Sequence, residues 1–178
     1  MDIKYLFTSK RLGFRNWQKS DKLPFAKMCA DKAVMEFFPN TRTKEESDAL
    51  IDRLSKHYLK FGYTFFAVDE LKTKQFIGFI GIINTDFEAF FTPCVEIGWR
   101  LQKESWYNGF ATEGAKRCLT YGFDKFNFKE IYAITPLKNL KSENVMLKIG
   151  MQKQGSFEHP KIEDGHWLKT EMLYKIER

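Results

Sequence analysis

Apolar residues recur at helical spacing in four stretches of the chain. The longest begins after Thr43, where Glu46 completes a capping box, and it ends at Gly62, a residue that readily closes a helix. The last is closed by Gly150. A run of small residues marks one face of the third stretch, which predicts a helix lying close to a sheet. The four predicted helices cover residues 23–29, 44–61, 111–126 and 139–148.

Strand-like runs of apolar and β-branched residues separate these helices. Polar or irregular connections at 69–74 and 85–93 join three consecutive runs, which is typical of an antiparallel meander. The resulting order of strands and helices predicts an α/β protein with a mixed sheet. The predicted strands cover residues 11–15, 63–68, 76–83, 94–101, 130–134, 151–157 and 168–176.

The segment Trp106–Glu113 lies between the predicted strand 94–101 and the predicted helix 111–126, and it contains Gly109. Backbone N–H groups at a helix N-terminus lack intrahelical partners, and the helix dipole adds partial positive charge there. A strand, a glycine turn and a helix start therefore form a site suited to a phosphate group. We expect a phosphorylated substrate or cofactor.

Length and charge limit the classes of protein that this chain can belong to. Its 178 residues are enough for one domain, and we expect a single domain over 1–178. Residues 1–90 carry 15 Lys and Arg against 12 Asp and Glu, and residues 91–178 carry 14 against 11, which is +3 in each half. This even distribution predicts no direct nucleic-acid partner, and we expect the mild positive charge to attract a small polyanion.

Cysteine usage and hydropathy point to the cytoplasm. Cys29, Cys94 and Cys118 are odd in number and widely separated, without the spacing of a zinc site, so we expect no metal. Residues 1–14 alternate charged and apolar positions and lack the apolar core of a signal peptide. No apolar run is long enough to cross a bilayer. We therefore expect a cytoplasmic protein without a membrane partner, either a monomer or a homodimer.

Six short motifs occur in the order and spacing of a known family. The chain resembles the GNAT family of N-acetyltransferases, and within it the branch that acetylates the N-termini of ribosomal proteins. The motifs are Arg11-Leu12, Phe76–Gly81, Glu96–Trp99, Trp106–Glu113, Asn139–Ser142 and Lys148–Met151. Many family members have Arg or Gln at the position of Trp106, whereas tryptophan is common there in the ribosomal-type branch.

The resemblance implies a fold and a cosubstrate, acetyl-CoA. It implies a mixed, mostly antiparallel sheet of about seven strands flanked by helices, whose fourth and fifth strands splay apart to admit the pantetheine arm. The turn around Gly109 would hold the pyrophosphate, and Asn139 would bond the pantetheine, alone or while also capping its helix. The implied cofactor-binding residues are Trp99, Arg100, Leu101, Tyr107, Asn108, Gly109, Phe110, Ala111, Thr112 and Asn139.

The resemblance also implies catalytic residues. An amine must lose its proton before it attacks a thioester, which calls for a general base. Glu96 is the candidate, because strand alternation places it on one face with Gly98 and Arg100, although a structural role is the competing interpretation. Ser142 would donate to the departing sulfur, unless it only adds polarity to the start of its helix.

Three further segments border the acceptor side in the family. Segment 157–166 contains Glu158 and His159, either of which is an alternative base, unless the segment is an ordinary solvated hairpin. Residues 37–39 and 87–91 are rich in phenylalanine and either line an apolar acceptor cleft or belong to the core.

The sequence thus predicts transfer of acetyl from acetyl-CoA to a primary amine in a ternary complex. The resemblance favours a protein N-terminus as the acceptor, and a small amine or antibiotic is the second candidate. A non-catalytic acyl-CoA sensor is the alternative of another class.

Overall fold

The computed structural model describes residues 4–178, and the expectation about a leader therefore rests partly on residues outside this range. Four α-helices form: α1 (Lys22–Ala30), α2 (Lys44–Phe61), α3 (Phe110–Phe126) and α4 (Leu140–Lys148). Short 3-10 turns at Lys19–Asp21 and Lys103–Ser105 precede α1 and α3. Each predicted helix is present, with ends that differ by at most one residue.

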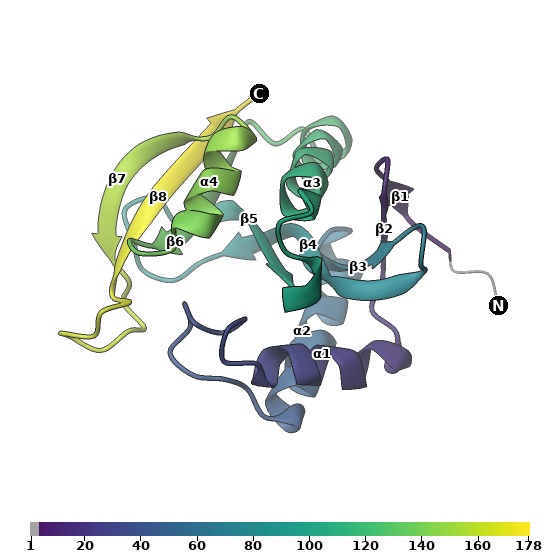
Figure 1. Cartoon of the computed structure of the whole chain (residues 1–178). Helices are drawn as coiled ribbons and strands as arrows, with labels where there is room; N and C mark the ends of the chain where they lie inside the picture. Colours follow the sequence, from purple (N-terminus) through teal and green to yellow (C-terminus); the bar gives the residue numbers. More distant parts are fainter. Residues whose placement is uncertain (1–3) are drawn as a thin grey trace.

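The strands form one sheet in the order β1-β2-β3-β4-β5-β6-β8-β7 (Figure 1). All neighbours pair antiparallel except β5 and β6, so the predicted mixed, mostly antiparallel sheet is confirmed. The bounds are β1 Phe7–Thr8, β2 Leu12–Arg15, β3 Phe65–Glu70, β4 Gln75–Thr85, β5 Cys94–Leu101, β6 Glu130–Pro136, β7 Gln152–Glu158 and β8 Thr170–Glu177.

The sheet has eight strands, where the sequence predicted about seven. The additional strand is β1, which has only two residues and therefore no alternation that a pattern could reveal. It forms because Phe7 pairs with Phe14 of β2 and the two rings stack 4.5 Å apart. Tertiary packing of one aromatic side chain thus creates an element that local preference leaves undetermined.

The parallel neighbours β5 and β6 separate along most of their length. Their register contains one pair, Glu96 with Tyr132, whereas β4 and β5 pair along the whole of β5. The predicted splay between the fourth and fifth strands of the sequence assignment is therefore present. It leaves the C-terminal half of β5 without a strand partner on its β6 side.

Helices α1 and α2 cover one face of the sheet, and α3 and α4 cover the other (Figure 1). Strand β4 serves both cores, because Phe79 packs with α1 and α2 while Ile80 and Ile82 face α3. A Cβ at Gly114 would lie 2.3 Å from Ile80, and one at Gly122 would lie 2.6 Å from Ile82. The small residues of α3 thus permit the close helix–sheet approach that the sequence predicted.

The capping signals of α2 are confirmed. Thr43 accepts a hydrogen bond from the main-chain N–H of Glu46 at 3.2 Å, and the Glu46 carboxylate accepts one from the N–H of Thr43 at 2.8 Å. Gly62 closes the helix in the left-handed conformation, with φ 79°. Strong local signals thus define both ends of the longest helix.

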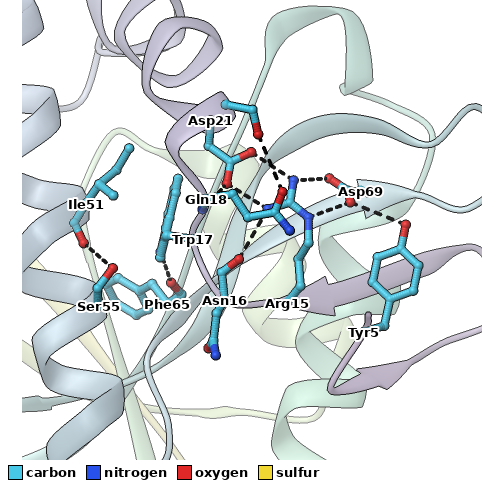
Figure 2. A network of polar contacts seen from close by, with 11 residues as sticks. Tyr5, Arg15, Asn16, Trp17, Gln18, Asp21, Ile51, Ser55, Phe65 and Asp69 are labelled. Carbon is cyan, nitrogen blue, oxygen red and sulfur yellow. Dashed lines mark hydrogen bonds and ion pairs between the residues drawn. The ribbon is translucent and has the colours of Figure 1, made fainter. Parts of the chain in front are cut away.

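A buried arginine joins the N-terminal strands to α1 (Figure 2). Arg15 donates two hydrogen bonds to Asp21, at 2.7 and 2.9 Å, and two to Asp69, both at 2.7 Å. Burial opposes its charge, but the bonds to both carboxylates raise the pKa of Arg15 above its usual range. Tyr5 also donates to Asp69. The cluster thus consists of one cation between two carboxylates, with a tyrosine hydroxyl beside them.

No helix within residues 4–178 combines the length and hydropathy needed to cross a bilayer.

Candidate active site

A cavity of about 420 Å³ lies where β5 diverges from β6, between the start of α3 and α4. We call it the first cavity. The loop between α1 and α2 contributes its other wall. Nine of the ten predicted cofactor residues line it: Trp99, Arg100, Leu101, Tyr107, Gly109, Phe110, Ala111, Thr112 and Asn139.

The tenth predicted residue, Asn108, is outside that lining. Its side chain donates to the carbonyl of Trp106 at 3.1 Å, and its own carbonyl accepts from Arg11 at 3.0 Å. These two bonds fix the shape of the turn, and the predicted role of Asn108 in binding stays a prediction.

The turn before α3 has the geometry expected of an anion site. Gly109 has φ 77° at the N-cap, and Tyr107 before it also has a positive φ of 61°. The first helical hydrogen bond runs from the N–H of Glu113 to the carbonyl of Gly109. The N–H groups of residues 110–112 precede that bond and are therefore available at the positive end of the helix dipole.

The side chain of Glu113 stabilises this turn through hydrogen bonds to Ser9 and Arg11. Its carboxylate accepts hydrogen bonds from the hydroxyl of Ser9 at 2.7 Å, and from the N–H and Nε of Arg11 at 2.7 and 2.6 Å. Partial burial acts against its charge, but these bonds lower the pKa of Glu113. Arg11 also covers the ring of Phe110 at 4.6 Å. The Arg11-Leu12 motif and the Trp106–Glu113 motif are far apart in the sequence, and together they stabilise this turn.

The tryptophan at position 106 has a specific bond. Its indole Nε1 donates to the carbonyl of Leu101 at 2.9 Å, and Lys141 lies 4.6 Å from its ring centre. The indole thus ties the end of β5 to the turn, in the place where many family members carry Arg or Gln. The bond occupies the Leu101 carbonyl. Arg100 pairs with Phe79 of β4 and Gln102 donates to Ile77 of β4, so the main-chain groups of Trp99 are the ones that face the β6 side.

Asn139 and Ser142 come together at the start of α4. The side-chain oxygen of Asn139 accepts from the N–H of Ser142 at 3.2 Å, so Asn139 is the helix cap. This bond uses the amide oxygen and not the amide nitrogen of Asn139. Both residues line the first cavity and also a second one.

The second cavity has about 400 Å³ and lies on the α1 and α2 side of β5. It contains two carboxyl groups, Glu96 from β5 and Glu171 from β8. The two cavities adjoin, because they share six lining residues: Phe37, Phe38, Trp99, Arg100, Asn139 and Ser142. A group held in the first cavity can therefore meet one held in the second.

Both carboxyls have environments that favour protonation near neutral pH. Burial raises the pKa of Glu96 to about 7, although Thr85 donates to it at 2.6 Å and acts in the opposite direction. Burial and the charge of Glu96 raise the pKa of Glu171 to about 8. The Oε2 atom of Glu171 is buried and has no hydrogen-bond partner within residues 4–178.

Sequence reasoning identified Glu96 and missed Glu171. The available signal was a single acidic residue between apolar positions of the last strand, Glu171 beside Met172 and Leu173. Such a residue on a strand is usually solvent-facing, so the signal gains meaning only when β8 is placed beside β6.

Segments 37–39 and 157–166 both reach the second cavity, and residues 87–91 do not. Phe37 and His159 are among the lining residues, whereas Glu158 is exposed and accepts from Thr170 at 2.7 Å. Burial and the charges of Lys161 and Lys169 lower the pKa of His159. The phenylalanines of 87–91 pack with Phe157 and Tyr132 instead.

Comparison with known proteins gives the family. The profile described as Acetyltransferase (GNAT) domain matches residues 11–152, which is most of the chain. The uncharacterized N-acetyltransferase YnaD of Bacillus subtilis is 29% identical over 171 residues, covering 95% of each chain.

Solved structures with the same fold include an acetyltransferase (GNAT family) from Bacillus anthracis, with TM-score 0.80 and 25% identity over 96% of each chain. Spermidine N-acetyltransferase from Vibrio cholerae, in complex with CoA and spermine, has TM-score 0.73 and 20% identity, covering 94% of this chain and 95% of that one. The solved structures share the fold, and the profile match with the similarity to YnaD assigns this chain to the GNAT family of acetyl-CoA-dependent acetyltransferases.

Proposed function

We propose that this protein transfers an acetyl group from acetyl-CoA to a primary amine by direct attack in a ternary complex, without a covalent enzyme intermediate. The observation that carries the proposal is the junction of two cavities at six shared residues. The first cavity has the features of an acetyl-CoA site. The second contains the carboxyl groups that can accept a proton from an amine. Both substrates can thus be present together, as direct transfer requires.

The residues of the first cavity fit the cosubstrate. The N–H groups at the start of α3 would hold the pyrophosphate, and the left-handed Gly109 keeps the approach to them free of a side chain. The open side of β5 at Trp99, with Asn139 opposite, would hold the pantetheine arm through hydrogen bonds. When bound, acetyl-CoA supplies an activated acetyl thioester.

The residues at the junction fit the chemistry. Glu96, as its carboxylate, accepts a proton from the ammonium group, either directly or through water, and leaves a neutral amine. Its raised pKa keeps this group near the pH at which an α-amino group also titrates. Ser142 would donate a hydrogen bond to the departing sulfur, and a main-chain N–H near Trp99 would stabilise negative charge on the carbonyl oxygen.

The acceptor has two candidates. The ribosomal-type motifs favour a protein N-terminus. A small amine is favoured by the contact between the two loops beside the second cavity, where the ring centres of Phe37 and Trp167 lie 6.0 Å apart. Both loops lie at the same end of the molecule (Figure 1).

Two measurements test the proposal. Calorimetry should detect acetyl-CoA binding, and an absence of binding at millimolar concentration would contradict both the enzyme and the acyl-CoA sensor. Release of free thiol against a panel of small amines and ribosomal N-terminal peptides should then occur with one class. Binding without any transfer would favour the sensor.

Glu96→Gln should lower turnover about 100-fold or more, because it removes the proton acceptor. Its affinity for acetyl-CoA should stay unchanged, since Glu96 lines only the second cavity. Glu158→Gln is the matched control, because Glu158 is an exposed glutamate that sequence reasoning offered as an alternative base. If Glu158→Gln loses activity and Glu96→Gln keeps it, the assignment of the base is wrong.

A further inference from the structure

Two arginines line the second cavity, and neither has a carboxylate partner within residues 4–178. Arg100 comes from β5 and is only 8% exposed, and Arg42 comes from the loop between α1 and α2. The Nε atom of each is buried and has no hydrogen-bond partner within residues 4–178. A buried donor left unpaired costs free energy, so its persistence calls for an explanation.

The surroundings of Arg100 are apolar or only weakly polar. One guanidinium nitrogen donates to the sulfur of Cys29 at 3.4 Å, and the guanidinium covers the rings of Phe38 at 4.0 Å and Phe79 at 5.3 Å. Burial lowers the pKa of Arg100, and the nearby charge of Arg42 acts in the same direction. A buried cation beside another cation is an arrangement that a bound anion would relieve.

Another buried arginine of this chain, Arg15, has a structural role and provides a comparison for Arg100. Arg15 is similarly buried, and Asp21 and Asp69 surround it with four hydrogen bonds (Figure 2). Arg100 has no such counterions among the described residues, and it faces a cavity where Arg15 faces the core. The contrast assigns Arg100 a partner from outside the chain.

The acids of the second cavity do not pair with these arginines. Within residues 4–178 no ion pair or hydrogen bond joins Arg42 or Arg100 to Glu96 or Glu171, although all four residues line the cavity. The cavity therefore has an acidic part formed by β5 and β8 and a separate basic part beside the α1–α2 loop. Lys161 adds a third cation to its lining.

We propose that the acceptor is a primary amine whose molecule also carries a carboxylate. Arg42 and Arg100 bind the carboxylate, with the planar donor geometry that guanidinium offers, while Glu96 and Glu171 face the amine. This assignment rests on the proposed acetyl transfer and names its class of acceptor. A cavity of about 400 Å³ has room for a free amino acid or for the first residues of an acidic peptide.

Matched acceptors test the inference. Thiol release from acetyl-CoA is measured with the free amino acids and with their carboxamides, which keep the amine and lose the negative charge. Peptides that begin with Asp or Glu are compared with peptides that begin with Asn or Gln. We expect kcat/KM at least tenfold higher for the acid in one series, and the series in which this occurs identifies the source of the carboxylate.

Arg42→Gln should remove this preference by raising KM for the acid at least tenfold, with little change for the carboxamide. Arg53→Gln, an exposed arginine on α2, is the control and should keep the preference. Arg100→Met should likewise raise KM for the acid at least tenfold. Calorimetry with acetyl-CoA shows whether each variant still folds and binds the donor.

A second readout is independent of turnover. With CoA present, N-acetyl amino acids should raise the melting temperature of the protein, and N-acetyl amino acid amides should not. Equal rates for acid and carboxamide, or an unchanged preference in Arg42→Gln, would overturn the inference while acetyl transfer stands. Loss of acetyl-CoA binding by the unmodified protein would instead overturn the proposed function.

Discussion

At the residue scale, the proposed chemistry uses two carboxyl groups that line one cavity. Glu96 and Glu171 come from different strands, and each has a raised pKa because protein replaces water around it. The negative charge of Glu96 adds to the raised pKa of Glu171, so ionisation of one carboxyl opposes ionisation of the other. We propose that Glu96 loses its proton first and is the base.

This order predicts the pH dependence of the reaction. With acceptor well below saturation, kcat/KM should rise as pH increases through about 7, where Glu96 becomes a carboxylate. The inflection should remain in Glu171→Gln, since a protonated Glu171 is neutral while Glu96 titrates. It should disappear in Glu96→Gln. A profile in Glu96→Gln that keeps the inflection near 7 would show that another group is the base.

At the element scale, the start of α3 depends on one residue with a left-handed backbone. Gly109→Ala adds a side chain that has space, because its nearest neighbour would be Arg11 at 3.5 Å, but the φ of 77° is strained for alanine. We expect a loss of about 1–2 kcal/mol in the free energy of unfolding, measured by urea denaturation. Affinity for acetyl-CoA should fall as the turn relaxes.

Gly165→Ala is the matched control. Gly165 has nearly the same φ, 79°, with open space around it, and it lies in the β7–β8 loop outside the first cavity. It should lose similar stability and keep its affinity for acetyl-CoA. If both variants bind acetyl-CoA equally well, the α3 turn is not the pyrophosphate site.

The packing of β2 and β3 with the start of α1 depends on Arg15. Arg15→Met leaves Asp21 and Asp69 buried without their cation, which should cost about 3–5 kcal/mol of unfolding free energy. The urea midpoint measures it, with Arg53→Met as the exposed control. A midpoint shift no larger than that of the control would show that the cluster contributes little to stability.

At the scale of the whole molecule, the two glutamates link stability to pH. Their folded-state pKa values of about 7 and about 8 exceed the ordinary 4.5, so the folded protein holds more protons than the unfolded chain between these limits. Their contribution to stability is therefore greatest at low pH and is lost as pH rises toward 8. The lowered pKa values of His57 and His159 act in the opposite direction at lower pH.

Comparing a glutamate variant with the unmodified protein separates the contribution of the glutamates to the pH dependence of stability from that of the histidines. The double variant Glu96→Gln with Glu171→Gln should gain stability over the unmodified protein as pH rises from 5 to 8, by several kcal/mol at pH 8. Urea denaturation across that range measures the gain. A difference between the two proteins that stays constant with pH would contradict the raised pKa values.

The elements of this fold were predictable because their signals are local. Thr43 and Gly62 define α2 through bonds to groups within one helical turn, and the apolar run of β5 predicted its bounds. The two-residue β1 was not predictable, since Phe7 becomes a strand residue only by pairing with Phe14. The eighth strand therefore had no signal of its own.

By itself, the sequence determined the element order and the glycine turn at the start of α3, because periodicity, capping and glycine conformation act over a few neighbouring residues. Only the tertiary structure decided which distant charges share a cavity. It placed Glu171 in one cavity with Glu96 and left Arg42 and Arg100 without acidic partners among the described residues. Sheet order and burial set the surroundings of each charge, and no short segment encodes them.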